Sequence, residues 1–161
     1  MTRFNTQKKY LLITAVVLTA FTGGYIVYHF KTASDYAGAI STDIKSVADF
    51  KLYMPRKLPQ GFVLKKDSIS YKGDILFVQF VKDDQQIFMS QQKKPNAMPP
   101  ISTLKGFSQL PVKIGYAVSG EQEGVSAVII NTNSSLITVT GDKTIASSEL
   151  ALFAKRLEQI N

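Results

Sequence analysis

Residues 63–92, VLKKDSISYKGDILFVQFVKDDQQIFMSQQ, decide the fold that we expect for most of the chain. The stretch contains three runs suited to β-strands, at residues 63–71, 75–81 and 86–92. Lys72-Gly73-Asp74 and Asp83-Asp84-Gln85 separate them, and short polar segments between such runs are typical of hairpin turns. The runs are therefore expected to pair in antiparallel fashion. The middle run is almost wholly apolar, which favours a central strand covered on both faces.

The chain that follows continues as strands and then changes its period. Three further runs favour strands, at residues 112–118, 125–130 and 136–140. An apolar stripe at helical spacing comes last, at Leu150, Phe153, Ala154 and Leu157. This stripe predicts a helix over residues 147–160, with Ser147 as its N-cap. We therefore expect an α+β fold, an antiparallel β-sheet with a C-terminal helix packed on it.

Residues 10–30 are of a different kind, because they contain no Asp, Glu, Lys or Arg. At 1.5 Å per residue, a helix of this length extends about 30 Å, which matches the hydrocarbon core of a bilayer. Arg3, Lys8 and Lys9 precede the segment, so the positive-inside rule places the N-terminus in the cytoplasm. The sequence thus predicts a single transmembrane helix. A cleaved signal peptide is the alternative, but its apolar core is normally shorter.

The transmembrane helix divides the expected protein into four parts. These are a basic cytoplasmic tail (1–9), the transmembrane helix (10–30), a tether (31–49) and an extracytoplasmic α+β domain (50–161). The protein is thus expected in the cell membrane, as a single-pass protein with its C-terminal domain outside. Ala15, Thr19 and Gly23 lie four residues apart in the membrane segment. Such a stripe of small residues is compatible with a weak homodimer of transmembrane helices.

A set of turn and core residues in the expected outer domain resembles a known family. The set comprises Tyr53-x-Pro55, Leu58-Pro59-x-Gly61-Phe62-x-Leu64, Gln91-Gln92 and Leu150-x-x-Phe153-Ala154-x-x-Leu157. It resembles a family of extracytoplasmic domains of unknown function on bacterial single-pass membrane proteins, some of which are anti-sigma-factor-like. The resemblance implies no catalytic residues. Residues 1–9 are too few for the folded cytoplasmic domain of such a regulator, so an anti-sigma function is not expected.

The side chains present argue against catalysis. The chain has no cysteine, and its one histidine, His29, lies at the expected membrane interface. Thiol chemistry, serine–histidine catalysis and ordinary zinc sites therefore lack their usual groups. We expect neither an enzyme nor a cofactor or metal site.

Two segments are candidate contact sites for a partner. Residues 93–100 contain three prolines and are expected to form an irregular loop, a kind of segment that often carries recognition. Met98 and Ile101 are its candidate partner-binding residues. Lys65 and Lys66 are candidate contacts to an anionic surface. Nucleic acid is not expected as a partner, because the domain is expected outside the cell.

Two functions remain open from the sequence. The first is a non-enzymatic, membrane-anchored binding or sensing module that acts outside the membrane on an unknown envelope protein or ligand. The second is a small lipid- or ligand-carrying domain with an apolar pocket between sheet and helix. A cavity lined by Phe77, Phe80, Ile87 and Tyr116 would favour the second function. A filled core with an exposed apolar patch would favour the first.

Overall fold

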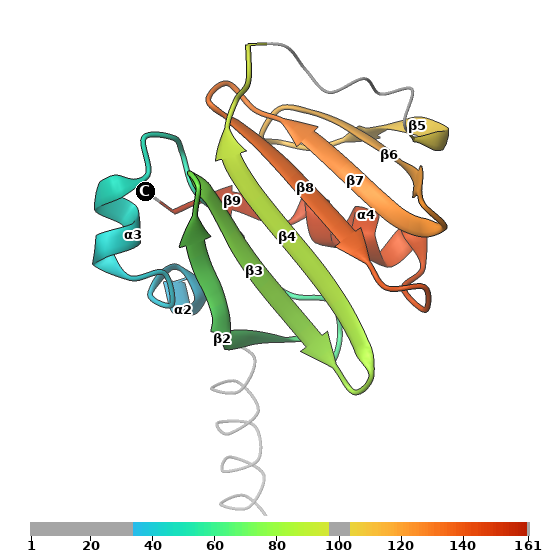
Figure 1. Cartoon of the computed structure of the whole chain (residues 1–161). Coiled ribbons are helices and arrows are strands. Elements are labelled where there is room, and N and C mark those ends of the chain that lie inside the picture. The colour runs from blue at the N-terminus through green and yellow to red at the C-terminus, as the bar shows by residue number, and fades with distance from the viewer. Residues whose placement is uncertain (1–33, 97–103, 161) are drawn as a thin grey trace, which may run out of the picture. The chain divides into compact units, whose positions relative to one another are not determined.

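The computed structural model describes residues 34–96 and 104–160, which contain nine strands and three helices (Figure 1). In chain order these are α2 (Ser34–Ala37), α3 (Thr42–Val47), β1 (Tyr53–Pro55), β2 (Val63–Lys72), β3 (Ile75–Lys82), β4 (Gln85–Lys93), β5 (Lys105–Pro111), β6 (Tyr116–Gln122), β7 (Val125–Asn131), β8 (Ser135–Gly141), α4 (Ser147–Lys155) and β9 (Leu157–Gln159). The predicted tail, the transmembrane helix and its small-residue stripe lie outside the described residues. Among the helices that are described, none is long and apolar enough to span a membrane.

Seven strands form one antiparallel sheet in the order β2-β3-β4-β8-β7-β6-β5 (Figure 1). The sheet consists of two meanders, β2-β3-β4 and β5-β6-β7-β8, which join where β4 pairs with β8. The two short strands β1 and β9 pair with each other, outside this sheet. The predicted antiparallel sheet is therefore confirmed.

The turn between β2 and β3 shows why the first hairpin forms where the sequence predicts it. Gly73 and Asp74 have φ angles of 56° and 61°. A two-residue turn of type I′ requires positive φ at both positions, and its twist matches that of the paired strands. Glycine adopts this conformation freely, and aspartate tolerates it better than most residues.

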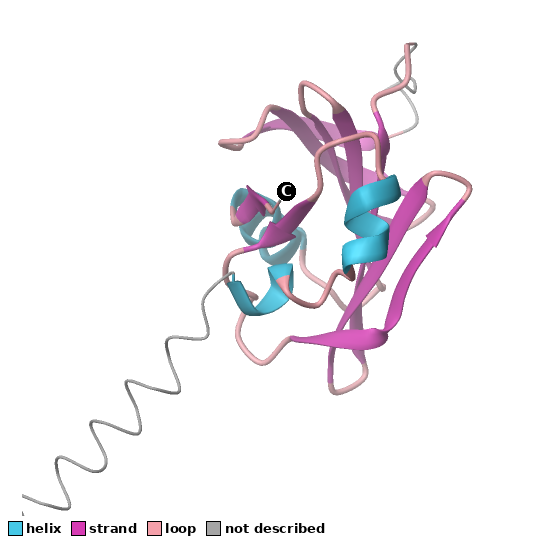
Figure 2. Ribbon diagram, turned by 90° about the vertical axis from the view of Figure 1, so that its left-hand side faces the viewer, coloured by secondary structure: helices cyan, strands magenta, loops and turns pink. Residues whose placement is uncertain are grey.

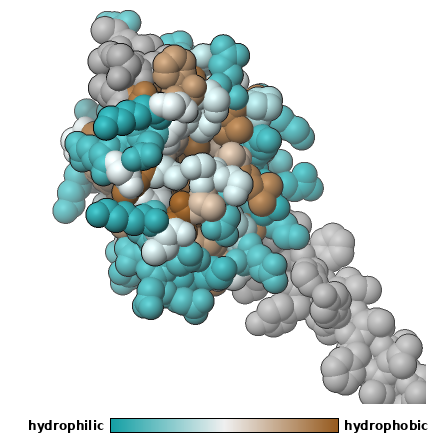
Figure 3. Space-filling model, turned by 90° about the vertical axis from the view of Figure 1, so that its right-hand side faces the viewer, coloured by the Kyte–Doolittle hydropathy of each residue, from teal (hydrophilic) through white to brown (hydrophobic). Residues whose placement is uncertain are grey.

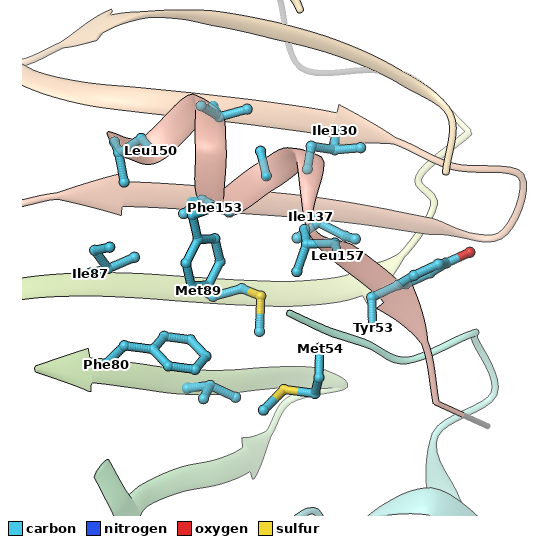
Figure 4. Packing of buried hydrophobic residues seen from close by; sticks show 14 of the residues in the cluster. Tyr53, Met54, Phe80, Ile87, Met89, Ile130, Ile137, Leu150, Phe153 and Leu157 are labelled. Carbon is cyan, nitrogen blue, oxygen red and sulfur yellow. The ribbon is translucent and has the colours of Figure 1, made fainter. Parts of the chain in front are cut away.

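The hydrophobic core lies between one face of the sheet, here called the inner face, and the segment formed by α4 and β9. Figure 2 shows the helices gathered on one side of the sheet. In Figure 4, Leu150, Phe153 and Leu157 point from the C-terminal segment towards Ile87 and Ile137 of the sheet. The rings of Phe153 and Phe80 meet edge to face, with centroids 4.9 Å apart. The predicted packing of a C-terminal helix on the sheet is thus confirmed.

The C-terminal helix is shorter than predicted. It ends at Lys155, and Arg156 leaves the helical region with φ −99° and ψ 2°. The next three residues form β9, in which Leu157 pairs with Pro55 of β1 while remaining buried. The last residue of the apolar stripe, Leu157, therefore lies in a strand and not in the helix, but it is buried in the same core. The predicted N-cap is also wrong. Ala146 occupies the N-cap position without a side-chain hydrogen bond, and the Ser147 hydroxyl hydrogen-bonds to that of Ser126 at 2.8 Å.

The second meander differs from the prediction in its first two strands, β5 and β6. The strand expected at residues 112–118 begins only at Tyr116, and β5 precedes it at Lys105–Pro111. The polar residues 119–122 belong to β6, so that the turn contains only Glu123 and Gly124. These strands lie at the exposed edge of the sheet, where polar residues cost little, and alternation alone therefore locates them poorly.

The domain begins earlier in the chain than residue 50. Ile40 is buried in the core with 2% of its surface exposed, and Tyr36 and Ile44 pack against the same core. Asp49 forms an ion pair with Lys93 at the end of β4, with 2.5 Å between Asp49 Oδ2 and Lys93 Nζ. The segment expected to be a tether is thus part of the folded domain from about Tyr36 onwards.

Candidate interaction surface

The face of the sheet opposite α4, here called the outer face, has no described helix lying over it (Figure 1). Along β3, the side chains of Leu76, Val78 and Phe80 are buried on the inner face. The alternate side chains, from Ile75 to Val81, lie on the outer face and are half-buried or exposed. The prediction that this strand is covered on both faces is wrong. Its apolar outer side faces solvent.

Two phenylalanines are the most exposed aromatic groups in the centre of the outer face. Phe77 on β3 and Phe88 on β4 keep 42% and 44% of their surface exposed. Phe88 pairs directly with Gln79, so Phe77 lies diagonally across from it on the adjacent strand. Diagonal neighbours are about 7–8 Å apart, which lets one ligand touch both rings.

Neutral polar side chains surround both rings. Cross-strand pairing places Gln79 and Thr140 beside Phe88, while Gln86 and Ser90 precede and follow it on the same face of β4. The Gln79 amide Nε2 donates a 2.7 Å hydrogen bond to Gln86 Oε1. This bond fixes the orientation of two amides at the rim of the Phe88 ring.

The surroundings of Phe77 are similar, except that the apolar side chain of Ile75 precedes it on the same face of β3. Its cross-strand neighbours are Ser70 on β2 and Ser90 on β4. Further along this row lie Thr138 on β8 and Ile129 on β7. The outer face therefore carries isolated aromatic rings among hydroxyl and amide groups, and not one continuous apolar surface.

The outer face of five neighbouring strands carries no charge. Charged residues make up 19% of the chain. Even so, none occupies an outer-face position of β3, β4, β8, β7 or β6 in the described part of the chain. Lys65 and Lys72 lie beyond this area, on the edge strand β2. The exposed rings therefore lie in a neutral field bordered by lysines on one side.

One carboxylate lies at the rim of this field. Asp142 follows the end of β8, and its carboxylate accepts hydrogen bonds from Gln86 N at 2.5 Å and from Thr144 N at 2.8 Å. Burial raises the pKa of this carboxyl, but the hydrogen bonds from Thr144, Gln86 and Ile145 outweigh burial and lower the pKa. Asp142 is thus an ionised turn residue that ties β4 to β8.

The half of the outer face nearer to β5 is partly covered. Leu104 packs over Val118 and Ala127, and these three side chains form a second, smaller buried cluster. Beyond this cluster, Phe107 and Tyr116 are exposed at 58% and 47%. Figure 3 views the domain from this side and shows hydrophobic and neutral groups among hydrophilic ones. The accessible centre of the outer face is therefore on β3 and β4.

The structure describes only one pair of the predicted contact residues. Lys65 and Lys66 are exposed on β2, where the pairing with β3 shifts register between Lys65 and Ser70. Lys65 pairs with Gln79, so it lies in the same row as Phe88 at the border of the neutral field. Met98 and Ile101 lie outside the described residues.

From the sequence, Phe77 was considered only as a pocket-lining residue and Phe88 was not considered, although one signal for an exposed aromatic face was available. Strand β3 has apolar residues on both of its sides, and the structure shows that only one of these sides is needed for the core; on β4, Phe88 is the one apolar residue of the outer side. A strand that is apolar on both sides within a two-layer domain leaves its second side to solvent or to a partner.

The residues expected to line a pocket do not share one side of the sheet. Phe80 and Ile87 are fully buried on the inner face, where Phe80 contacts Phe153. Phe77 and Tyr116 are exposed on the outer face. These four side chains therefore cannot line one cavity between the sheet and the helix.

Acidic and metal-binding groups do not gather within the described ranges, 34–96 and 104–160. No group of three His, Cys, Asp or Glu side chains in them is placed to hold a metal ion. Comparison with known protein families, characterised proteins and solved structures returns no match for this chain.

Proposed function

We propose that this protein is a membrane-anchored, extracytoplasmic binding or sensing module without enzymatic activity, which contacts its target through the outer face. The single observation that carries this proposal is the pair of exposed phenylalanines, Phe77 and Phe88, in the centre of an uncharged sheet face. Exposed aromatic groups on a rigid scaffold are a frequent feature of binding surfaces.

The filled inner face also supports binding over carriage of a lipid. Large side chains from the sheet, including Phe80, Ile87 and Met89, meet Phe153 and Leu150 of α4 and have essentially no exposed surface. A carrier domain needs an apolar cavity of several hundred Å³. The side chains expected to line such a cavity are instead divided between the two faces of the sheet.

Location and membrane anchoring rest on residues 10–30 and on the basic residues before them. Protease added to intact spheroplasts should therefore digest the domain while sparing a tag at the N-terminus. Protection of the domain from the protease would contradict the proposed orientation.

Binding through the outer face can be compared with the other candidate surfaces by photo-crosslinking in living cells. A photoreactive amino acid is placed at position 88 on the outer face, at 65 on its border, at 98 in the loop, or at 152 on α4. Leu152 is a matched control, because it is 42% exposed on the opposite side of the domain. We expect the strongest adduct from position 88. Adducts from 98 or 65 without one from 88 would move the site to the loop or to the lysines.

A further inference from the structure

We propose that the outer face binds a neutral polysaccharide strand, with Phe77 and Phe88 as stacking platforms. This assignment rests on the proposed function, because it names the class of ligand that the same surface would take. It follows from three properties of the outer face: its lack of charge, its separated aromatic rings and its fixed amide groups.

The charge pattern argues against an ionic ligand. A surface that selects an anion or a cation places complementary charges around the contact, because charge complementarity steers and orients the partner. The outer-face positions of β3, β4 and β8 carry only apolar, hydroxyl and amide side chains. The lysines on β2 border this area and do not enter it. A ligand centred on Phe88 therefore contacts neutral side chains first, and the charged groups Lys65 and Asp142 lie only at the border, where the Asp142 carboxylate already accepts hydrogen bonds from Gln86 and Thr144.

The aromatic rings match the apolar side of a sugar. A pyranose ring has faces of C–H groups, slightly positive, that lie well against the negative face of an aromatic ring. Its hydroxyl groups project from the rim of the sugar. Phe88 has the complementary arrangement, with Gln79, Thr140, Gln86 and Ser90 around it. Aliphatic side chains at these positions would complement an apolar protein partner better than amide and hydroxyl groups do.

The amide pair supplies hydrogen-bonding groups in a fixed orientation. Gln79 Nε2 and Gln86 Oε1 bond to each other at 2.7 Å. Each amide then presents its other polar atom, Gln79 Oε1 as an acceptor and Gln86 Nε2 as a donor. These are the two kinds of group that sugar hydroxyls and N-acetyl groups bind. Because the amides are already oriented, less side-chain entropy is lost on binding.

The extent of the surface over neighbouring strands indicates a polymer and not a single sugar. Phe77 and Phe88 lie diagonally on adjacent strands, and Thr138 and Thr140 extend the polar surface onto β8. A single sugar on such an open face would bury little of its own surface, whereas an extended chain makes several shallow contacts at once.

The test measures binding of the full-length protein in detergent micelles to two neutral probes by calorimetry. The probes are the β-1,4-linked hexamers of N-acetylglucosamine and of glucose. We expect saturable binding of at least one hexamer, which Phe88→Ala should weaken by about tenfold or more and Phe77→Ala to a similar extent. Binding should be equal at about 0.05 M and about 0.5 M salt, because no ion pair is involved.

Two variants serve as matched controls. Phe107→Ala removes a phenylalanine that is more exposed, at 58%, on the edge strand β5, and should leave binding unchanged. The double variant Lys65→Glu with Lys66→Glu should also bind as the parent does. Each variant is first checked for an unchanged melting temperature, which is expected because the side chains concerned are exposed.

Three results would overturn the assignment: no saturable binding of either hexamer, binding that survives Phe88→Ala, or binding only to anionic phospholipid vesicles with loss at high salt. A photo-adduct from position 88 in cells, without binding of a hexamer, would leave the proposed binding function standing and remove the glycan. Absence of both would remove both.

Discussion

Gln91 on β4 is the buried polar residue whose replacement should have the largest effect. Its side chain has no exposed surface and lies among the apolar residues of the inner face. Its amide acts as a backbone mimic: Tyr53 N donates to Gln91 Oε1 at 2.8 Å, and Gln91 Nε2 donates to Tyr53 O at 2.7 Å. The side chain thereby fastens β1, which lies outside the large sheet, to the centre of that sheet.

The expected cost of Gln91→Met follows from these two bonds. Methionine has a similar length but leaves the N–H and C=O of Tyr53 without a partner, and Tyr53 is itself 95% buried, with 5% exposed. Each buried, unsatisfied group costs about 1–3 kcal/mol, so the pair costs about 2–6 kcal/mol. A domain of this size is stable by about 5–15 kcal/mol, so the loss is a large fraction of the total.

The measurement is denaturant unfolding of parent and variant, combined with limited proteolysis. Gln92→Met is the matched control, because Gln92 is the next residue of β4, pairs with Leu136 on the outer face and is half-buried. Its effect should stay within about 0.5 kcal/mol. If opening is local, cleavage near β1 should increase before global unfolding. An unfolding free energy of Gln91→Met equal to that of the parent, with unchanged cleavage, would refute this reasoning.

Three further predictions concern stability. Asp142→Asn should lower the free energy of unfolding at neutral pH. The difference from the parent should shrink as the pH falls below 3.8, the ordinary pKa of the group, because a lowered pKa stabilises the fold only while the carboxylate is ionised. A difference that grows in acid, measured by urea unfolding, would contradict this. Phe153→Ala should cost about 3–5 kcal/mol, whereas Leu152→Ala on the exposed side of α4 should be nearly neutral in the same measurement. A fragment starting at residue 50 should be less stable in thermal unfolding than one starting at residue 34, by about 1.5–3 kcal/mol for the loss of buried Ile40 alone. Equal melting temperatures of the two fragments would show that residues 34–49 are a tether and not part of the fold.

Residues 63–92 illustrate what the sequence could predict. Glycine and aspartate in a turn with positive φ determine local geometry, and this turn sets the register of the strands on either side. The apolar stripe of α4 likewise predicts its own docking. In these places local chemistry and the final packing agree, so the sequence was sufficient.

Contacts between segments that are distant in the chain could not be predicted from the sequence. Leu157 continues a helical pattern, but pairing with Pro55, about 100 residues earlier in the chain, makes it a strand. Gln91 was singled out only as part of a motif, since a glutamine is normally expected on the surface and its partner is a backbone 38 residues away. Phe77 and Phe88 became contact candidates only once the structure showed which side of their strands the core uses.

Hydroxyl-radical footprinting followed by mass spectrometry tests directly whether the outer face is the binding surface. Oxidation of Phe77 and Phe88 is compared between the purified protein and intact cells, with Leu152 on α4 as the internal reference. Both phenylalanines are exposed in the structure, at 42% and 44%, as is Leu152 at 42%. If a ligand covers the outer face, Phe77 and Phe88 are protected in cells relative to Leu152. Equal oxidation of all three residues in both states would contradict it.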